Sequence, residues 1–416
     1  MEYGCIGEHL KHSFSKEIHN ALADYDYKIL EIERENLKEF FYKKDFKAIN
    51  VTIPYKQEII PYLDEISPEA KRINAVNTVV NRDGRLYGYN TDFYGLKALI
   101  EREKVSINGK KVLVLGSGGT SNTAVAVAEF LGATEVVKVS RNKKEGYVTY
   151  DDVYEKYTDF EIIINTTPCG MFPDIGASAV NLKKFTSLEA VFDAVYNPLK
   201  SKLICDAKAL GVTATGGLYM LVSQAAYAVE RFIDTPVDNE KVENIFKNLY
   251  KNKMNIVLVG MPASGKSTIG KLLSQKLSKD FVDTDDLIIE AQGKPITEIF
   301  SEIGEKGFRQ IEKEEIFSVS SRNNHVIATG GGAILDKGNT DILKENGRIY
   351  FINRPLENLV ATSDRPLSSD ADALKKRYNE RYSLYVECAD AVIDGSGTVD
   401  EVAERIEADF YEYSCN

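Results

Sequence analysis

The stretch NIVLVGMPASGKS, residues 255–267, decides the fold of the C-terminal part of this 416-residue chain. Its first five residues form an apolar run that is typical of a strand buried in a parallel sheet. The remaining eight match the pattern G-x-x-x-x-G-K-[ST], in which backbone N–H groups of a glycine-rich loop surround phosphate oxygens. Ile269, Leu272, Leu273 and Leu277 then recur at helical spacing. This strand–loop–helix order predicts a site for a nucleoside triphosphate.

The same pattern assigns roles to individual residues of the loop. Lys266 is expected to reach the outer phosphates, and the hydroxyl of Ser267 is expected to bind Mg²⁺. The helix that begins there adds a positive dipole end. The expected ATP-binding residues are Gly260, Ser264, Gly265, Lys266, Ser267 and Thr268.

Charged side chains downstream predict a pocket for the phosphate acceptor. Residues 281–285 read FVDTD, a strand ending in Asp283 and Asp285. We expect both carboxylates at one sheet edge, one facing a metal ion and the other an acceptor hydroxyl. Arg309 and Glu312 stand three residues apart, so on a helix the carboxylate can hold the guanidinium in place.

Three more segments complete this C-terminal pattern. Residues 326–332, VIATGGG, form an apolar strand that ends in glycines, which allow a ligand to approach the backbone closely. Residues 364–367 (DRPL) and 381–385 (RYSLY) supply two further arginines. From about residue 254 onward the chain therefore resembles shikimate kinase, whose P-loop, D-[ST]-D, F-R-x-x-E, G-G-G-A, R-P-L and R-x-x-L-Y motifs all have counterparts in order.

The resemblance to shikimate kinase implies how the acceptor is held. Asp285 would hold or deprotonate the acceptor hydroxyl, and Arg309 and Arg381 would grip the carboxylate of shikimate. Gly331 and Gly332 would line the ring. Paired arginines suit a planar carboxylate better than lysines do, because the guanidinium donates two parallel hydrogen bonds.

The resemblance also implies the metal site and a lid. Ser267 and Asp283 would bear on Mg²⁺, Lys266 would act on the transferred phosphate, and Arg365 would belong to a closing lid that contacts the nucleotide. One departure concerns adenine. The family often has an extra arginine before the lid, and residues 359–363 have none.

A second strand–loop–helix unit begins at residue 111. KVLVLGSGG ends in Gly116, Gly118 and Gly119, which predicts a dinucleotide-binding turn. Ser121 stands at the third glycine position of the usual fingerprint. The next apolar strand is followed by Arg141, where an NAD enzyme usually places an acid. A charge-assisted bond to the 2′-phosphate predicts about ten- to hundredfold preference for NADP.

Segments nearer the N-terminus carry polar groups beside apolar strands. They read HSFS at 12–15, NVTIPYK at 50–56, INAVNT at 73–78 and GYNTD at 88–92. Each taken alone is also explained by a helix cap, a solvated lysine or turn chemistry. Together with the G-x-G-G loop and GLYMLVSQA at 217–225, they make residues 1–250 resemble shikimate dehydrogenase.

This second resemblance implies a site for ketone reduction. Lys56 and Asp92 would be the catalytic pair, because a lysine ammonium can stabilise the developing oxyanion and deliver its proton. The residues implied to hold the substrate carboxylate and ring hydroxyls are Ser13, Ser15, Thr52, Asn77 and Gln224. Those implied for NADP(H), besides the glycine loop and Arg141, are Asn165, Thr166, Met171 and Gly217.

The expected fold class is α/β, with two enzyme-like halves. Residues 1–252 would form the dehydrogenase-like half, and residues 253–416 a P-loop kinase domain with a central parallel sheet. Within the first half we expect a substrate-binding part at 1–100, a Rossmann-type NADP-binding part at 101–215 and returning helices at 216–252.

Composition limits the partners and the compartment. The formal net charge is −11, whereas a general binder of nucleic acid or anionic membranes would need the opposite sign. The sequence has no apolar run of roughly 18 residues and no recognisable secretion signal. Its five cysteines are odd in number and widely spaced, which favours reduced thiols in a cytoplasmic protein.

The expected function is bifunctional. The front half would reduce 3-dehydroshikimate to shikimate with NADPH, and the back half would phosphorylate shikimate with ATP and Mg²⁺. Two alternatives remain for the front half: a quinate-type dehydrogenase that uses NAD, and a module that senses the ring acid without catalysis. An adenylate or gluconate kinase is the rival for the back half, where Asp285, Arg309 and Arg381 favour a small carboxylated, hydroxylated acceptor. The partners expected are these small molecules, and the oligomeric state is left open.

Overall fold

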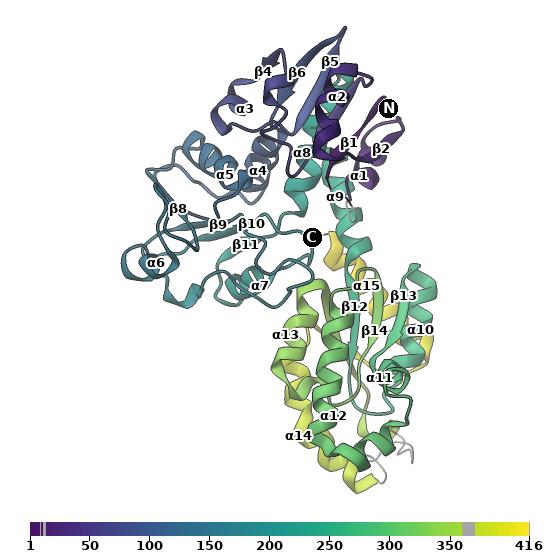
Figure 1. The fold of residues 1–416 in the computed structure, drawn as a ribbon. Helices are drawn as coiled ribbons and strands as arrows, with labels where there is room; N and C mark the ends of the chain where they lie inside the picture. The colour runs from purple at the N-terminus through teal and green to yellow at the C-terminus, as the bar shows by residue number, and fades with distance from the viewer. Residues whose placement is uncertain (9, 11–13, 360–370, 416) are drawn as a thin grey trace. The chain divides into compact units, whose positions relative to one another are not determined.

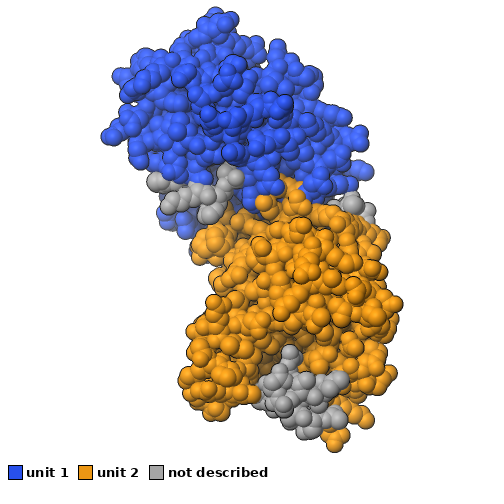
Figure 2. Space-filling model, turned by 90° about the vertical axis from the view of Figure 1, so that its right-hand side faces the viewer, with its two compact units in different colours: residues 1–169, 178–196, 206–248 blue, residues 170–177, 197–205, 249–416 orange. Residues whose placement is uncertain are grey.

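The computed structural model describes residues 1–8, 10, 14–359 and 371–415 (Figure 1). Two of the predicted site residues, Ser13 and Arg365, lie outside the described residues. The chain forms two compact units, coloured separately in Figure 2. The first contains residues 1–169, 178–196 and 206–248, and the second contains residues 170–177, 197–205 and 249–416.

The first unit begins with a mixed six-stranded sheet, in the order β2-β1-β3-β5-β6-β4. Strand β3 is parallel to β1 and antiparallel to β5, so the carboxyl end of β3 lies beside the amino end of β5. Asn50 and Thr78, which are distant in the sequence, are neighbours there. The strands are β1 (Tyr3–Gly7), β2 (Tyr27–Glu31), β3 (Ala48–Val51), β4 (Glu65–Ile66), β5 (Thr78–Arg82) and β6 (Arg85–Tyr89). The helices are α1 (Ser15–Leu22), α2 (Arg34–Lys43), η1 (Ile60–Tyr62) and α3 (Pro68–Ile73).

Side chains alternate between two apolar layers on this sheet. Ile6 and Ile49 belong to the core that includes Phe41 of α2, whereas their neighbours Cys5 and Ala48 belong to the opposite layer. The opposite layer also contains residues of a later helix, α8 (Leu218–Ile233). The chain therefore returns to the first sheet after it has built the second.

The second sheet of this unit is parallel, in the order β11-β10-β9-β7-β8. The strand order reverses between β7 and β9, and ligands of such folds bind at this switch point, beyond the carboxyl ends of the strands. The elements are α4 (Thr91–Arg102), β7 (Lys111–Leu115), α5 (Gly119–Phe130), β8 (Glu135–Val139), α6 (Tyr150–Lys156), β9 (Ile162–Asn165), η2 (Leu182–Lys184), β10 (Ala190–Asp193), α7 (Lys202–Ala209) and β11 (Thr213–Thr215).

Helix α8 packs closely against α4, and Gly95 makes that approach possible. A Cβ on Gly95 would lie 2.6 Å from the carbonyl oxygen of Met220 and 2.8 Å from Cβ of Gln224. The side chain of Gln224 is thereby held beside the first turn of α4. A further helix, α9 (Asn239–Lys253), follows α8.

The second unit is built on a parallel sheet of five strands, in the order β13-β14-β12-β15-β16. Helix α10 packs against α15 and helix α12 against α13 (Figure 1). The elements are β12 (Asn255–Val259), α10 (Lys266–Leu277), β13 (Asp280–Asp283), α11 (Thr284–Gln292), α12 (Ile296–Ser320), β14 (His325–Ala328), η3 (Ala333–Leu335), α13 (Lys337–Asn346), β15 (Gly347–Asn353), η4 (Leu356–Asn358), α14 (Ala371–Cys388), β16 (Ala391–Asp394) and α15 (Val399–Cys415).

The predicted α/β architecture is confirmed. The apolar run at 255–259 forms the fully buried central strand β12, and the run at 111–115 forms β7 beside the switch point. Within the described part of the chain, no helix is both long and apolar enough to cross a membrane.

Candidate active sites

Lys56 and Asp92 meet at the end of the first sheet. The ammonium of Lys56 donates to Oδ2 of Asp92 over 2.5 Å. Lys56 lies in a turn after β3, and Asp92 lies in the first turn of α4. The two side chains are 24% and 15% exposed, so the pair can still be reached by a small molecule.

A buried hydrogen-bond network stands beside this pair. The backbone N–H of Thr91 donates to Oδ1 of Asn77 over 2.7 Å, and the Thr91 hydroxyl donates to Oε1 of Gln224 over 3.3 Å. Asn90 caps α4, because its side chain accepts from the backbone N–H of Phe93. Two of the predicted substrate residues, Asn77 and Gln224, are thus joined through one threonine next to Asp92.

The other predicted substrate residues of this half are less constrained. Thr52 follows β3, and its backbone N–H donates to the carbonyl of Ile6 over 3.0 Å. A Cβ on Gly7 would lie 2.7 Å from Cγ2 of Thr52, so that glycine leaves room for the threonine. Ser15 begins α1.

The predicted dinucleotide loop follows β7. Gly116 has φ of +119°, and a Cβ there would lie 2.6 Å from Oγ1 of Thr166, so the fold itself requires this glycine. A Cβ on Gly118 or Gly119 would meet nothing within 4 Å. The protein's own packing does not require those two glycines, and the exposed backbone at the start of α5 suits the close approach of a pyrophosphate. Buried Ser121 holds the loop by donating to the carbonyl of Gly118 over 2.7 Å.

Asn165 supports this site from inside the protein. It is fully buried at the end of β9, where its amide donates to Oδ1 of Asp193 over 2.8 Å. Its Oδ1 accepts from the backbone N–H and the hydroxyl of Thr167. Thr166 donates its hydroxyl to the carbonyl of Leu115, which ties the loop after β9 to the end of β7.

The remaining predicted cofactor residues lie in different surroundings. Arg141 is exposed directly after β8, with Lys143 and Lys144 nearby in the chain. Gly217 caps α8, and a Cβ there would lie 2.4 Å from the carbonyl oxygen of Ala194. Met171 is 42% exposed and lies in residues 170–177, one of the segments grouped with the second unit.

The P-loop of the second unit wraps around the amino end of α10. Gly260 and Gly265 have φ of +156° and +91°, conformations that favour glycine. The ammonium of Lys266 donates to the carbonyls of Gly260 and Met261 over 3.0 and 2.9 Å. The hydroxyl of Ser264 is buried and has no hydrogen-bond partner among the described residues. These features fit a loop that binds a phosphate. Thr268, also predicted to bind the nucleotide, is exposed in the first turn of α10.

Ser267 and the two aspartates lie together, as the sequence pattern predicts. The Ser267 hydroxyl donates to Oδ2 of Asp283 over 2.6 Å. Asp283 caps α11, because its Oδ1 accepts from the backbone N–H of Asp285 over 3.0 Å. A hydroxyl and a carboxylate beside a phosphate loop form the hard oxygen donor set that Mg²⁺ prefers, so these residues fit the ion.

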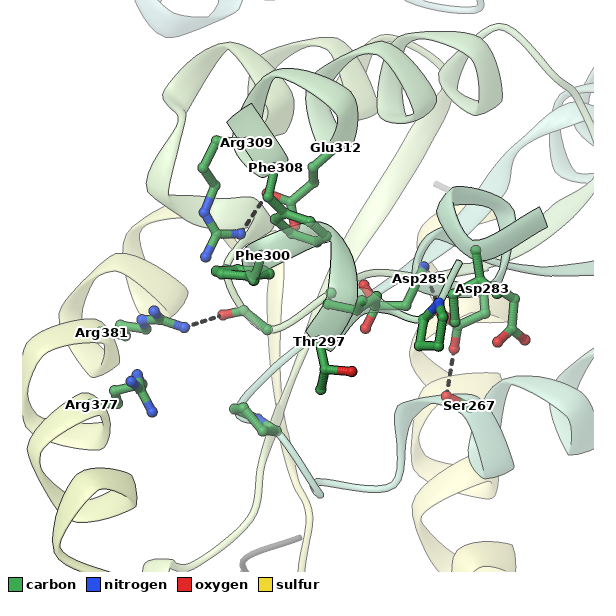
Figure 3. Close-up of a pocket in the computed structure, with 18 of the residues that line it drawn as sticks. Ser267, Asp283, Asp285, Thr297, Phe300, Phe308, Arg309, Glu312, Arg377 and Arg381 are labelled. Carbon is green, nitrogen blue, oxygen red and sulfur yellow. Dashed lines mark hydrogen bonds and ion pairs between the residues drawn. The ribbon is translucent and has the colours of Figure 1, made fainter. Parts of the chain in front are cut away.

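A cavity of about 490 Å³ opens beside the P-loop (Figure 3). Ser267 and Asp283 lie at one end, and Arg309, Arg377 and Arg381 lie at the other. The wall between them includes Asp285, Thr297, Phe300, Phe308 and the three glycines that follow β14. The predicted metal and phosphate groups therefore share one cavity with the predicted carboxylate-binding arginines.

The expected pair of Arg309 and Glu312 is confirmed. The guanidinium donates to Oε2 of Glu312 over 2.7 Å, and Glu312 is 1% exposed. Burial raises the pKa of Glu312 and Asp285 adds to the increase, whereas Arg309 opposes it. For Arg309, burial lowers the pKa but Glu312 and Glu305 outweigh it, so the guanidinium stays charged. The Nε of Arg309 has no hydrogen-bond partner among the described residues.

The glycines after β14 are dictated by their neighbours. A Cβ on Gly330 would lie 2.5 Å from Oδ1 of Asp285, and one on Gly332 would lie 2.3 Å from the guanidinium of Arg309. Buried Arg381 donates to the carbonyl of Gly331 over 2.9 Å, and the hydroxyl of Tyr385 donates to the same oxygen over 2.5 Å. The glycine run therefore leaves room for Asp285, Arg309 and Arg381 to lie against the same stretch of backbone.

Sequence reasoning missed several residues of this cavity. Arg377 lies one helical turn before Arg381 on α14, on the side of Arg381 away from Arg309 (Figure 3). The i, i+4 spacing of the two arginines was the available signal. The rings of Phe300 and Phe308, 4.5 Å apart, form an apolar wall. Nothing in the sequence separates those two phenylalanines from ordinary core residues.

The folds and the two sites define a class of protein: a dinucleotide-dependent oxidoreductase joined to a P-loop phosphotransferase. Comparison with known proteins narrows this class to particular families. Residues 5–79 match the shikimate dehydrogenase substrate binding domain family, and residues 262–410 match the shikimate kinase family. The chain belongs to the shikimate dehydrogenase family and carries a shikimate kinase domain in its C-terminal part.

Individual relatives cover the front half. A shikimate dehydrogenase (NADP⁺) of Clostridium perfringens (strain SM101) is 38% identical over 265 residues, which are 59% of this chain and 97% of that protein. The crystal structure of a chorismate mutase/shikimate 5-dehydrogenase fusion protein from Clostridium acetobutylicum has a TM-score of 0.57 at 36% identity, covering 59% of this chain and 96% of that one. The crystal structure of the Thermus thermophilus shikimate 5-dehydrogenase in complex with NADP(H) and shikimate has a TM-score of 0.54 at 28% identity. The match covers 60% of this chain and 99% of that one.

Proposed function

We propose that this chain is a bifunctional enzyme of the shikimate pathway. Residues 1–252 reduce 3-dehydroshikimate to shikimate with NADPH, and residues 253–416 phosphorylate shikimate to shikimate 3-phosphate with ATP. One observation carries the proposal: a single chain holds a lysine–carboxylate pair next to a dinucleotide fold and a P-loop next to an arginine-lined cavity. Both halves match families named for the same ring acid, and the product of the first reaction is the substrate of the second.

Lys56 is the proposed proton donor in the reductase site. NADPH supplies the hydride when it is bound. Negative charge then develops on the ketone oxygen, and the ammonium of Lys56 stabilises it and delivers the proton. Asp92, 2.5 Å from the ammonium, holds the side chain of Lys56 in position. A sensing module without catalysis would not need this pair, which favours the enzyme over that alternative.

Polar groups from separate segments of the first unit are assigned to hold the substrate. Asn77 directly precedes β5, and Gln224 lies on α8. Thr52 directly follows β3, and Ser15 is the first residue of α1. We assign the ring hydroxyls and the carboxylate to these four residues together with Ser13. Asn165 is assigned a positioning role, because both ends of its amide are bonded within the protein.

NADP is the proposed cofactor, and the relatives named above as NADP⁺ enzymes favour it over the alternative of NAD and quinate. Arg141 carries this preference in our assignment. Arg141→Ser is expected to raise the KM for NADP⁺ about ten- to hundredfold and to leave the KM for NAD⁺ unchanged. Lys110→Ser, before the amino end of the neighbouring strand β7 and paired with Glu189, is the matched control. Steady-state kinetics with both cofactors measure this, and an equal loss with both would assign Arg141 no role in discrimination.

The kinase site combines positioning with charge neutralisation, which dominate phosphoryl transfer. Lys266 neutralises the transferred phosphate, and Asp285 holds or deprotonates the acceptor hydroxyl. Ser267 and Asp283 would hold Mg²⁺, which supplies further neutralisation of phosphate charge when bound. Arg309, fixed by Glu312, and Arg381, fixed by the carbonyl of Gly331, grip the shikimate carboxylate.

Arg377 is a further cation that we assign to the acceptor end of the kinase cavity. The cavity is lined by four carboxylates, Asp283, Asp285, Asp286 and Glu312, and by four cations, Lys271, Arg309, Arg377 and Arg381. Removing one cation leaves a net negative lining that repels an anionic acceptor. Arg377→Leu is therefore expected to raise the KM for shikimate about tenfold or more, with little change in the KM for ATP. Lys376→Leu, exposed on the same helix, should change neither KM, and an equal result for both variants would contradict the assignment.

We also propose a cytoplasmic location. It is supported by the odd number and wide spacing of the five cysteines. No disulfide joins Cys5, Cys169, Cys205 and Cys388, the four whose side chains the structure describes. Reduced thiols are usual in that compartment.

Two assays on the purified chain test the proposed function. It should oxidise shikimate with NADP⁺, and it should consume ATP with Mg²⁺ only when shikimate is added. ATP turnover that is independent of shikimate would count against the kinase assignment. Oxidation of quinate with NAD⁺ at the same efficiency would restore the alternative for the front half.

A further inference from the structure

The orientation of the Asn77 side chain is fixed by donors. Its Oδ1 accepts from the backbone N–H of Thr91 over 2.7 Å, and a backbone amide can only donate. The hydroxyl of Thr78 lies 3.1 Å from the same oxygen. The amide nitrogen of Asn77 must therefore point the other way, as a donor. A reversed amide would set nitrogen against the N–H of Thr91 and present an acceptor in place of a donor.

The hydroxyl of Thr91 also lies 3.1 Å from the Thr78 hydroxyl and 3.2 Å from Oδ1 of Asn77. The Thr78 hydroxyl has one proton, and a donor to its oxygen leaves that proton for Asn77. The Nδ2 of Asn50 lies 3.1 Å from the Thr78 hydroxyl and supplies that donor. Asn50 in turn keeps its nitrogen on this side because its oxygen accepts from the hydroxyl of Tyr27 over 2.7 Å. A directed chain of hydrogen bonds thus runs from Tyr27 through Asn50 and Thr78 to the oxygen of Asn77.

The fold shields this chain from water. Tyr27, Asn50, Thr78 and Asn77 are all buried. Asn50 pairs with Cys5 of β1 and with Thr78 of β5, so Tyr27 on the edge strand β2 reaches Asn50 across β1. The ring of His19 stacks on Tyr27 at 3.9 Å and fixes its plane. With water excluded, each amide and hydroxyl has few other partners, which makes the direction of the chain matter.

We infer that Tyr27 and Asn50 are positioning residues for the dehydrogenase reaction, which reinforce the orientation that the backbone N–H of Thr91 gives the Asn77 amide, so that its nitrogen donates to a ring hydroxyl of the substrate. This inference rests on the proposed function of the front half. Both residues are buried, and the inference assigns neither of them a contact with the substrate.

Tyr27→Phe tests the inference, because it removes one hydroxyl and keeps the ring that stacks on His19. Without that hydroxyl, the buried oxygen of Asn50 loses its donor, and only the contacts of its nitrogen with the carbonyl of Asn77 at 3.3 Å and with Thr78 at 3.1 Å still hold the amide. The hold of Thr78 on Asn77 is then weaker. The KM for shikimate is expected to rise about five- to tenfold, with kcat and the KM for NADP⁺ nearly unchanged. Tyr3→Phe, in the same aromatic cluster, is the matched control and should behave like the unmodified chain.

A double-mutant cycle with Asn77→Ala separates positioning from general damage to the fold. In the Asn77→Ala background, Tyr27→Phe should have no further effect on the KM for shikimate. Thr78→Val, which conserves shape and removes the donor to Asn77, should reproduce the Tyr27→Phe shift and serves as the second variant if Tyr27→Phe folds poorly. The circular dichroism spectrum of each variant reports whether the chain is folded.

The outcomes distinguish the inference from the proposal on which it rests. If the unmodified chain oxidises shikimate but the KM is unchanged in Tyr27→Phe and Thr78→Val, the inference is wrong. It is also wrong if the KM shift is the same with and without Asn77. If the unmodified chain does not oxidise shikimate, the proposed function itself fails.

Discussion

Lys56→Ala is expected to lower kcat for shikimate oxidation with NADP⁺ by about a hundred- to ten-thousandfold, the usual contribution of a positioned general acid or base. Shikimate-dependent ATP consumption by the same chain should be unchanged. The physical reason is that no other ammonium is bonded to Asp92 among the described residues, so the developing oxyanion would lose both its charge partner and its proton donor. Parallel assays of both activities on one preparation measure this.

The control for Lys56→Ala is Lys71→Ala, an exposed lysine on α3 of the same unit. It should leave both activities unchanged. If Lys56→Ala kept the circular dichroism spectrum of the unmodified chain but reduced both activities to the same extent, the two-site account would be wrong, because one lysine would then serve both reactions.

Asp285→Asn is expected to produce the reciprocal result. The amide conserves the shape of the side chain beside Gly330 but cannot accept a proton from the acceptor hydroxyl. We expect kcat for shikimate-dependent ADP formation to fall by about a hundred- to ten-thousandfold. Shikimate oxidation with NADP⁺ should continue at the rate of the unmodified chain.

The matched control is Glu290→Gln, an exposed acid further along α11. It removes the same charge from the same helix without touching the cavity, so both activities should persist. Retention of ADP formation in Asp285→Asn would show that another group receives the proton and would contradict the assigned role.

The kinase site is the part that the sequence predicts best, because its signals are local. The P-loop occupies eight consecutive residues, and the Asp283–Asp285 and Arg309–Glu312 spacings each fall within one turn or one strand end. Spacing alone then determines which side chains meet. The predicted pair of Arg309 and Glu312 is accordingly present in the structure.

The dehydrogenase site depends on contacts between distant segments. Lys56 and Asp92 are 36 residues apart, and Thr91 and Gln224 are 133 apart. Periodicity does not predict such contacts, and the assignment came from resemblance to a family. The sequence assigned no role to Tyr27, or to Asn50 beyond its place in the NVTIPYK segment, because the contact of these two residues crosses an intervening strand whose position in the sheet the sequence does not define.

Arg377 shows a different limit. Its spacing from Arg381 places both on one helix face, but charge on a helix is more often solvated than functional. Only the packing of α14 against the cavity separates it from Lys376, its exposed neighbour.

The central claim is that one chain binds the same ring acid in two separate sites and carries it through two reactions. The purified chain, given 3-dehydroshikimate, ATP and Mg²⁺, should form no ADP until NADPH is added. ADP should then appear in the same amount as NADPH is oxidised. ADP formed before NADPH is added, or NADPH oxidised without any ADP, would contradict the account.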